Sequence, residues 1–337
     1  MAHTMNDVAR LAGVSSSTVS RVLNENPHIS VETVRRVIAA VDQLQYLRNA
    51  HARRLAIRKS DLFGLVISEI ANPFFSEIIC GFQAAAWDRG FDVLLLNTEY
   101  ERNRTAPMIR KLIENSVRGV AIMTSSLDDA IIPTLTKQGI GVVTINPVPV
   151  ERLVSNLTIN YEQGLAQAIE HVASLGHRRV AVIAGPQTNR TASKIQRVLV
   201  KGLKKLGLDP NPVTNSDYHL DAGAAAIRVI LAARKTPTVI FCGSDLIAMG
   251  AMMALEEAGI KVPQDMSVIG IDDIPFSLLM RPALTTIRVP RKLLGEASFE
   301  ALDKLQKSKR PRGTAYVIET ELVIRQSPAP VRSLRDV

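Results

Sequence analysis

Short apolar segments alternate with longer amphipathic segments from Leu62 onward, and this alternation constrains the fold more than any other feature of the chain. Strands that are apolar throughout, with helices between them, are typical of parallel sheets covered by helices on both faces. In such folds a ligand binds beyond the carboxyl ends of the strands. The predicted strands are residues 62–67, 93–96, 119–123, 142–145, 180–184, 238–241 and 268–271. The predicted helices include residues 73–89, 105–115, 161–175 and 244–258.

The first 60 residues have a different pattern, which predicts three short helices. The first covers residues 6–11, and the second follows Gly13 and the N-cap Ser15 and runs to residue 23. The third begins after the N-cap Ser30, and its apolar stripe comprises Val34, Val37, Ile38, Val41 and Leu44. Three short helices with a Gly-containing turn between the first two indicate a helix-turn-helix.

The net charge of +9 is unevenly distributed along the chain. Residues 1–60 contain nine Lys and Arg against four Asp and Glu, whereas residues 61–337 carry a net charge of only +4. A basic N-terminal segment favours an anionic partner, most often nucleic acid. A solvated basic surface without a partner would have the same charge, so charge alone leaves both interpretations open.

Composition and motifs exclude several classes of protein. The 337 residues provide room for about two domains, and no apolar run approaches the roughly 20 residues needed to cross a bilayer. The N-terminus lacks the apolar core of a signal peptide. Cys80 and Cys242 lie in apolar stretches, where we expect buried side chains rather than a disulfide or metal site. Because two isolated cysteines form no disulfide framework, we expect a location in the reducing cytoplasm. The sequence has no P-loop, HExxH or GxSxG motif, so we expect no catalytic residue and no cofactor.

Residues 6–24 carry the most specific motif in the chain, NDVARLAGVSSSTVSRVLN. This stretch closely resembles the DNA-binding headpiece of the lactose-repressor (LacI/GalR) family, whose pattern is DVAxxAGVSxxTVSRVxN. The resemblance continues over essentially the whole chain, notably in residues 184–186, 244–250, 268–273 and 282–287. The regulatory part is also similar to the purine repressors of the same family, in residues 241–243 and 262–265.

The resemblance implies a small all-α helix-turn-helix headpiece followed by an α/β domain of the type 1 periplasmic-binding-protein fold, with two doubly wound lobes. The implied divisions are residues 1–47 for the headpiece, 48–60 for a hinge helix or linker and 61–337 for effector binding and dimerisation. Within the last, the N-lobe would comprise about residues 61–158 and 288–318, and the C-lobe about residues 159–287 and 319–337.

The second helix would present Ser16, Ser17 and Arg21 on one face. Arg can bind guanine bidentately, and Ser hydroxyls can contact several base edges. By resemblance, Ser16 and Ser17 match the two specificity positions, and Arg21 matches the Arg that contacts a base or phosphate. The other candidates around this helix are polar residues suited to capping, packing or phosphate contact: Ser15, Thr18, Ser20, Asn24 and His28.

The hinge is the second family motif. Members usually have YxPNxxARxL here, and residues 46–56 are YLRNAHARRLA. The resemblance implies that Asn49 caps a short helix formed on operator DNA and that Leu55 wedges between base steps in the minor groove. Away from DNA, Leu55 would be a packing residue. The hinge candidates also include Ala52 and Arg53, while Arg48 replaces the usual Pro and adds a charge beside the phosphates.

The resemblance also implies an effector cleft between the two lobes. Asp272 matches the acidic residue that accepts hydrogen bonds from the effector, and Tyr218 matches an aromatic position over which a ring stacks. Ser244 stands where many members bind a sugar hydroxyl through Asn. The remaining wall and lining candidates are Phe74, Phe75, Asn146 and Thr191.

One effector-binding residue of the family is displaced. Ungapped alignment places Ile195 at the position of the family's Arg, and Ile145 where an acidic residue is frequent. A local shift of the alignment would place Arg197 or Arg190 at the position of the family's Arg, although neither aligns with it without a gap. We therefore expect a cleft less polar than a sugar site, and an effector that is not a standard monosaccharide, or no effector at all.

Together these features predict a dimeric transcription regulator, a repressor, that binds a pseudo-palindromic operator under the control of a small-molecule effector. Residues 326–332 contain two Pro and no apolar heptads, so we expect no tetramerising tail. Two alternatives remain: a regulator controlled by a protein co-regulator, and a solute-binding protein. A signal peptide and the absence of a headpiece would mark the latter.

Overall fold

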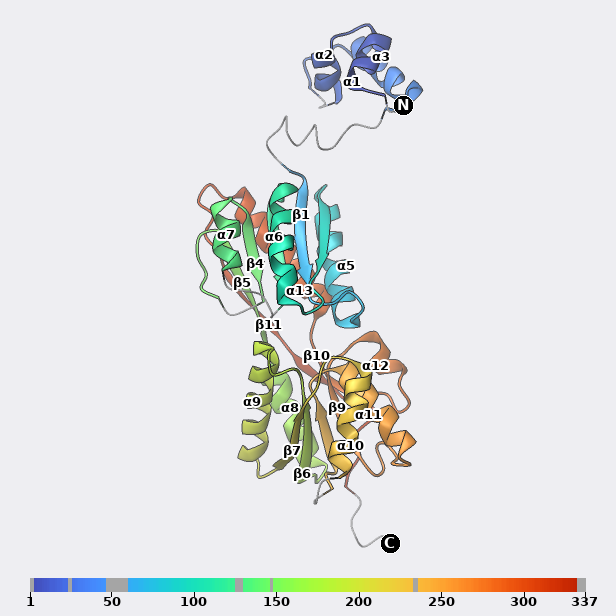
Figure 1. Ribbon diagram of the computed structural model, residues 1–337, viewed down its shortest axis with the longest axis vertical. Helices are drawn as coiled ribbons and strands as arrows, with labels where there is room; N and C mark the ends of the chain where they lie inside the picture. The colour runs from blue at the N-terminus through green and yellow to red at the C-terminus, as the bar shows by residue number, and fades with distance from the viewer. Residues whose placement is uncertain are drawn as a thin grey trace. The chain divides into compact units, whose positions relative to one another are not determined.

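The computed structural model describes residues 3–23, 26–46, 60–124, 130–145, 148–232 and 236–331. The chain divides into two compact units, residues 1–60 and residues 61–337, and each is described by itself. Helices and strands carry the labels of Figure 1.

The smaller unit consists of the helices α1 (Met5–Ala12), α2 (Ser16–Leu23) and α3 (Val31–Gln43). Thr4 caps α1 in a capping box, and Gly13 ends it in the left-handed conformation that Gly adopts without strain. Ser15 and Ser30 each accept a hydrogen bond from the backbone amide three residues later. The three predicted helices and both predicted N-caps are therefore confirmed.

Apolar side chains from all three helices form the core of this unit. Val8, Val19 and Val37 are completely buried. Ile38 was expected on the same stripe, but it is 42% exposed, so that expectation is wrong. One residue after Val37, it points about 100° further around α3 and away from the core.

The larger unit contains two six-stranded sheets, each at the centre of a lobe. We call the lobe around β11-β5-β4-β3-β1-β2 the N-lobe and the lobe around β12-β10-β9-β8-β6-β7 the C-lobe. The paired strands are parallel except β10 and β12. The N-lobe strands are β1 (Leu62–Ile67), β2 (Asp92–Asn97), β3 (Gly119–Met123), β4 (Gly141–Thr144), β5 (Val154–Asn160) and β11 (Ala315–Glu319). The C-lobe strands are β6 (Arg179–Ala184), β7 (Asp209–Asn215), β8 (Val239–Cys242), β9 (Ser267–Asp272), β10 (Thr285–Arg288) and β12 (Glu321–Val323).

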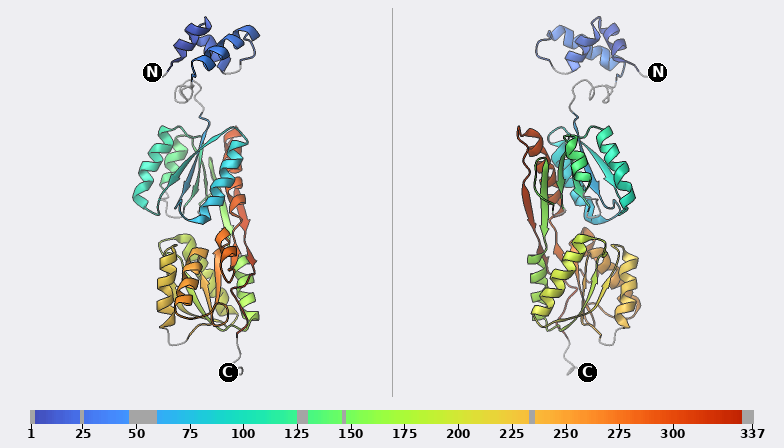
Figure 2. Two further views of the ribbon diagram at one scale, coloured as in Figure 1. Left: turned by 90° about the vertical axis from the view of Figure 1, so that its right-hand side faces the viewer. Right: turned by 60° about the vertical axis from the view of Figure 1, so that its left-hand side comes forward.

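Helices cover both faces of each sheet, as the turned views in Figure 2 show. Phe63 and Leu65 of β1 pack with α5 (Pro73–Trp87) and α13 (Arg291–Lys307), whereas Leu62 and Val66 pack with α6 (Thr105–Glu114) and α7 (Ile131–Lys137). Successive residues of a strand face opposite sides, so a strand buried on both must be apolar throughout. In the C-lobe, α8 (Glu162–Ser174) and α9 (Arg190–Lys205) share one core cluster, and α10 (Leu220–Leu231) and α11 (Asp245–Glu257) share another. Both lobes are therefore doubly wound α/β sheets.

The chain passes between the lobes after β5, after β10 and after β11. The carboxyl ends of β1, β3, β6 and β9 consequently lie near the junction of the lobes. Residues at these ends, or in the segments that follow them, line one cleft. Two short helical elements complete the unit: η1 (Arg102–Arg104) and α12 (Pro275–Leu279).

The predicted strands and helices are all present, with ends shifted by a few residues. The sequence pattern does not predict five of the strands in the described structure: β5, β7, β10, β11 and β12. In β5 polar residues alternate with apolar ones, and β7 contains Pro210 and Pro212. Because β7 lies at the edge of its sheet, its outer backbone amides need no strand partner and Pro is tolerated there.

Cys242 is buried, but Cys80 is exposed, so its predicted burial is wrong. The apolar stretch around it forms α5, whose Ile78 and Phe82 face the core while Cys80 lies on the outer side. None of the helices in the described part of the chain has the length and apolarity that crossing a bilayer requires.

Helices α5 and α13 cross at two glycines, and we expect alanine there to destabilise the N-lobe. A Cβ added at Gly81 would lie 2.3 Å from the carbonyl oxygen of Lys292, and one at Gly295 would lie 2.2 Å from that of Ile78. Gly295→Ala should lower the free energy of unfolding by about 1–3 kcal/mol, the usual cost of overpacking. Urea unfolding followed by circular dichroism measures this, with Gln83→Ala on the exposed side of α5 as control. Equal stability of the two variants would contradict a close backbone crossing.

Candidate functional site

Helix α2 carries a polar surface of the smaller unit. Ser17 and Arg21 are exposed and lie four residues apart, so they share one face of the helix. Ser16 is half-buried, and its hydroxyl donates to Oδ1 of Asn6 on α1 at 2.7 Å. The Oγ atoms of Ser15 and Ser17 lie 2.8 Å apart. The face therefore combines a row of hydroxyls with one guanidinium group.

The predicted DNA-contact residues divide into those that the structure describes and those that it does not. The described ones lie in or beside α2, with one exposed residue in the turn before α3: Ser15, Ser16, Ser17, Thr18, Ser20, Arg21 and His28. The others lie outside the described residues: Asn24, Asn49, Ala52, Arg53 and Leu55. All of these roles stay predictions.

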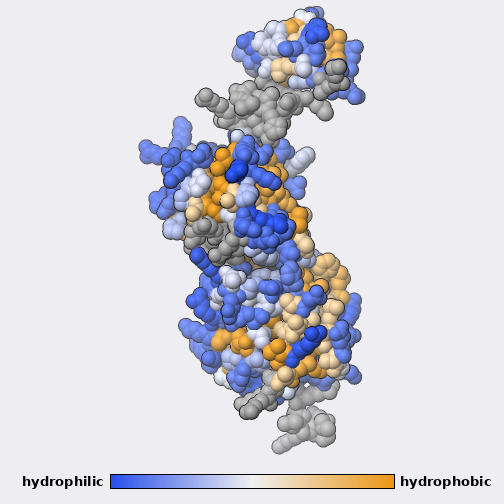
Figure 3. Space-filling view, in the orientation of Figure 1, coloured by the Kyte–Doolittle hydropathy of each residue, from blue (hydrophilic) through white to orange (hydrophobic). Residues whose placement is uncertain are grey.

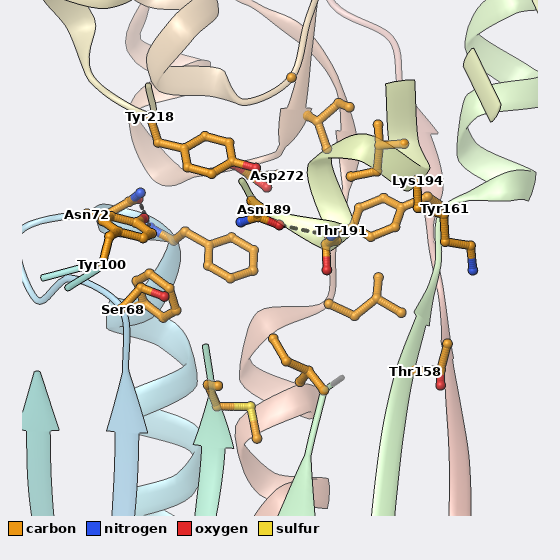
Figure 4. Close-up of a pocket in the computed structure, with 18 residues that line it drawn as sticks. Ser68, Asn72, Tyr100, Thr158, Tyr161, Asn189, Thr191, Lys194, Tyr218 and Asp272 are labelled. Carbon is orange, nitrogen blue, oxygen red and sulfur yellow. Dashed lines mark hydrogen bonds between the residues drawn. The ribbon is translucent and has the colours of Figure 1, made fainter. Parts of the chain in front are cut away.

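A cleft of about 950 Å³, counted out to its open mouth, lies between the N-lobe and the C-lobe (Figure 4). Its N-lobe side is lined by Ser68, Asn72, Phe74, Phe75, Tyr100, Met123, Ile145, Thr158 and Ile159. Its C-lobe side, with the crossover after β5, is lined by Tyr161, Asn189, Thr191, Lys194, Ile195, Tyr218, Gly243, Ile271 and Asp272.

Aromatic rings line the cleft from both lobes. Phe74 and Phe75, at the start of α5, lie edge to face with ring centroids 5.1 Å apart. The ring centroids of Tyr100 in the N-lobe and Tyr218 in the C-lobe are 6.2 Å apart. Tyr218 fits because Gly185 has no side chain: a Cβ added there would lie 2.5 Å from the hydroxyl oxygen of Tyr218. Burial raises the pKa of Tyr100 and of Tyr218, so both phenols stay protonated and can donate hydrogen bonds.

Asp272, at the end of β9, places a carboxyl group in the cleft. Burial raises the pKa of this carboxyl well above its usual range, and Asp245 raises it further against an opposing effect of Arg291. The φ angles of Asp272 and Asp273 are +119° and +58°, in a region that side chains disfavour. Arg291 holds this strained turn, because its guanidinium donates to the carbonyl oxygens of both residues, to that of Asp273 at 2.8 Å.

Arg291 also joins the two lobes. It is the first residue of α13, only 3% exposed, and its Nη2 lies 2.8 Å from Oε2 of Glu77 on α5. The neighbouring carboxylate of Asp273 pairs with Nε of Arg288 at 2.7 Å and with Nη2 of Arg325 at 2.5 Å. The carboxyl end of β9 is thus tied to two N-lobe helices and to the segments that cross between the lobes.

Asp245, at the start of α11, is a second buried carboxyl group in this region. Its Oδ2 accepts hydrogen bonds from Oγ of Ser277 at 2.5 Å and from the amide of Ile274 at 2.8 Å, and its Oδ1 accepts one from Thr286 at 2.5 Å. A Cβ on Gly270 would lie 2.2 Å from Oδ1, so only Gly fits there. Burial raises the pKa of Asp245 to about 6, although these hydrogen bonds oppose the shift.

Comparison with known proteins places this architecture in a family. Residues 4–49 match the model of bacterial regulatory proteins of the lacI family, and residues 169–328 match that of a periplasmic binding protein-like domain. The HTH-type transcriptional repressor PurR of Photobacterium profundum is 32% identical over 327 residues, which cover 96% of this chain and 98% of that protein. The chain belongs to the lacI family of bacterial regulatory proteins.

Other members of the family show the same relationship. PurR of Vibrio vulnificus is 32% identical over 333 residues, 96% of this chain and 98% of that protein. The structure of the lac repressor dimer bound to operator and the anti-inducer ONPF is similar with a TM-score of 0.86 and 29% identity, covering 98% of this chain and 100% of that one. A transcriptional regulator CelR–cellobiose complex is similar with a TM-score of 0.71 and 30% identity, covering 96% and 99%.

The effector residues predicted for this lacI-family chain have different positions. Five of them line the cleft: Phe74, Phe75, Thr191, Tyr218 and Asp272. Asn146 lies outside the described residues. The structure does not place Ser244 in the lining: it is 3% exposed, and its hydroxyl caps α11 by accepting the amide of Ile247 at 3.2 Å. The backbone of the adjacent Gly243 lies there instead.

Arg197 is also absent from the lining, and Lys194 is the basic residue of α9 that faces the cleft. Arg197 is exposed, and its Nε donates to the carbonyl oxygen of Ser193 at 3.3 Å. Because it follows Ile195 by two residues, it points about 200° away around the helix. Ile195 and Ile145 both line the cleft, in agreement with the expectation of a less polar site.

Sequence reasoning missed several lining residues: Asn72, Tyr100, Tyr161, Asn189 and Lys194. A local signal exists for the two Asn residues, because each is the N-cap of a helix that follows a predicted strand. Tyr100 has no such signal, since it lies in a turn that only the folded chain brings opposite Tyr218.

We expect the Asp245→Asn substitution to change how stability depends on pH. The pKa of the Asp245 carboxyl is about 6 in the folded chain, against an ordinary value of 3.8. The protonated carboxyl therefore contributes its full stabilisation below pH 3.8, and this contribution is lost as the pH rises through about 6. Relative to Asp245→Asn, the native chain should therefore lose about 2 kcal/mol between pH 4.5 and pH 7.5. Urea unfolding at several pH values measures the difference, with the exposed Asp209→Asn as control. A difference that is constant with pH would contradict the raised pKa.

Proposed function

We propose that this chain is a repressor that binds a pseudo-palindromic operator as a homodimer, and that a small molecule in the inter-lobe cleft controls this binding. The carrying observation is that one chain combines the α2 face, with Ser16, Ser17 and Arg21, and a cleft that contains Asp272 and aromatic rings. The PurR relatives are named transcriptional repressors, and the similar lac repressor structure is a dimer bound to operator and an anti-inducer. These relationships support the proposal.

In this proposal residues 1–47 read the operator, residues 48–60 form the hinge and residues 61–337 sense the effector. Strand β1 begins at Leu62, so a movement of the N-lobe acts directly on the hinge. Arg291 connects the segment that carries Asp272 to α5 and α13 of the N-lobe. An effector that binds one orientation of the lobes more tightly thereby shifts the population of the DNA-competent hinge. The PurR relatives are named as transcriptional repressors, which supports a role in the cytoplasm without catalysis.

Arg21→Ala tests the assignment of the recognition helix. The full chain should select a palindromic site from random duplex DNA, and the variant should bind that site about 10–100-fold more weakly, as expected for loss of a bidentate base contact. Affinity for unrelated DNA should change little. Fluorescence anisotropy measures both affinities, with Arg197→Ala as the control for loss of one exposed Arg. Unchanged selectivity of Arg21→Ala would count against the assignment.

An exposed apolar surface of the C-lobe is the proposed dimer contact. Phe276, Leu278 and Leu279 of α12 are 48%, 60% and 66% exposed, and Met253 of α11 is 51% exposed. Figure 3 shows apolar residues gathered on the right-hand side of the C-lobe. Large exposed apolar patches mark interaction sites, and a two-fold axis lets one patch bury itself against its copy.

Leu279→Asp should convert the dimer to a monomer at micromolar concentration, because it places an unpaired charge in the centre of this surface. Sedimentation or light scattering measures the mass. Leu206→Asp, which replaces an exposed Leu at the end of α9, should leave the dimer intact. A native tetramer, or a Leu279→Asp variant that stays dimeric, would show the assignment to be wrong.

A further inference from the structure

The asparagine side chains of the cleft already use their acceptor atoms within the protein. Oδ1 of Asn72 accepts the backbone amide of Phe74 at 3.0 Å. Oδ1 of Asn189 accepts the amides of Thr191 and Ala192 at 2.9 and 3.1 Å. Asn189 still offers a ligand its Nδ2, a donor, whereas the side chain of Asn72 is also hydrogen-bonded to Tyr100.

The charged lining residues in the described structure are Lys194 and Asp272. Lys194 lies at the exposed rim of the cleft, and within the described part of the chain no ion pair or hydrogen bond engages its ammonium group. Figure 4 shows Asn189, Thr191 and Lys194 following one another at the start of α9. The first turns of α9 therefore bring amide, hydroxyl and ammonium donors to the cleft, and among them the ammonium group of Lys194 suits a carboxylate.

The other walls of the cleft favour a flat, apolar body. Phe74 and Tyr100 come from the N-lobe, and Tyr161 and Tyr218 come from the C-lobe and the crossover. Ile195 replaces the Arg that the family pattern places on this helix. Aromatic rings on both sides of a cleft bind a planar ring through its faces and edges.

We propose that the effector is an aromatic carboxylate whose ring carries a hydroxyl or amino group, an inference that rests on the function proposed above. Its carboxylate pairs with the ammonium group of Lys194 at the rim, where water still solvates the charge. Its ring packs between the aromatic side chains of the two lobes. Its hydroxyl or amino hydrogen is donated to the carboxyl group of Asp272.

A monosaccharide fits this cleft less well. Each sugar hydroxyl taken from water needs a hydrogen-bonding partner, and an unpaired one costs binding free energy. Oδ1 of Asn189 already accepts two backbone amides and that of Asn72 accepts one, and Ile145 and Ile195 offer no polar atom. A ligand with one charged end and a ring that the aromatic walls can cover matches the cleft better.

Titration calorimetry with the full chain tests the proposal, using benzoate, 3-hydroxybenzoate, 4-hydroxybenzoate and 4-aminobenzoate. The matched neutral probe is 4-hydroxybenzamide, and the sugar probes are glucose and ribose. We expect submillimolar binding of at least one substituted acid, at least about tenfold weaker binding of the amide, and no measurable binding of the sugars. Failure of all four acids to bind, or tight binding of either sugar, would overturn the proposal.

Lys194→Met identifies the carboxylate contact. It should weaken binding of the acid by about tenfold and leave binding of the amide nearly unchanged, because only the acid loses a charge-assisted hydrogen bond. Lys201→Met, two turns later on the exposed side of α9, is the control and should bind the acid like the native chain. If the two substitutions weakened binding of the acid equally, Lys194 would not contact the carboxylate, and the proposal would be wrong.

The proposed repressor function has a separate test. Selection of a duplex site depends on α2, and it is measured with the chain alone and again with each of the four acids present. If no site is selected under either condition, the repressor function fails. If a site is selected and the aromatic acids do not bind, only the effector class is wrong.

Discussion

Three carboxyl groups meet near the carboxyl end of β9, and the contacts that hold this corner also connect the two lobes. Asp245 is buried among hydroxyl and amide donors, and Asp273 is paired with Arg288 and Arg325. Asp272 faces the cleft and has no basic side chain against its carboxyl among the ion pairs of the described residues. Two of the three carboxyl groups are thus engaged by several donors or basic side chains, whereas Asp272 accepts a hydrogen bond from the backbone of Asp245 and faces the cleft.

The backbone of this corner carries the connection between the lobes. The left-handed φ angles of Asp272 and Asp273 cost free energy, and such strain persists only where surrounding contacts hold it. Arg291 supplies those contacts from α13 while it pairs with Glu77 on α5. A ligand that engages Asp272 would therefore act on a segment already joined to the N-lobe, whose β1 begins at Leu62, directly after the proposed hinge.

Much of the fold was predictable because burial on two faces leaves a strong pattern. Strands such as β1 and β3 are apolar throughout, and Ser15 and Ser30 precede amphipathic helices as N-caps. The pattern fails for β7, because an edge strand is exposed and tolerates Pro. It also fails for Cys80, because an apolar helix packed on one side still has an outer face.

By itself the sequence determined the helix-turn-helix, the doubly wound lobes and the family, since these depend on local caps, on apolar periodicity and on a contiguous motif. Only the tertiary structure decided that Lys194 faces the cleft while Arg197 and Ser244 do not. The rotation of α9 is set by the burial of Ile195, Leu199 and Leu203 against the sheet, and a cleft between lobes is built from segments that are far apart in the chain.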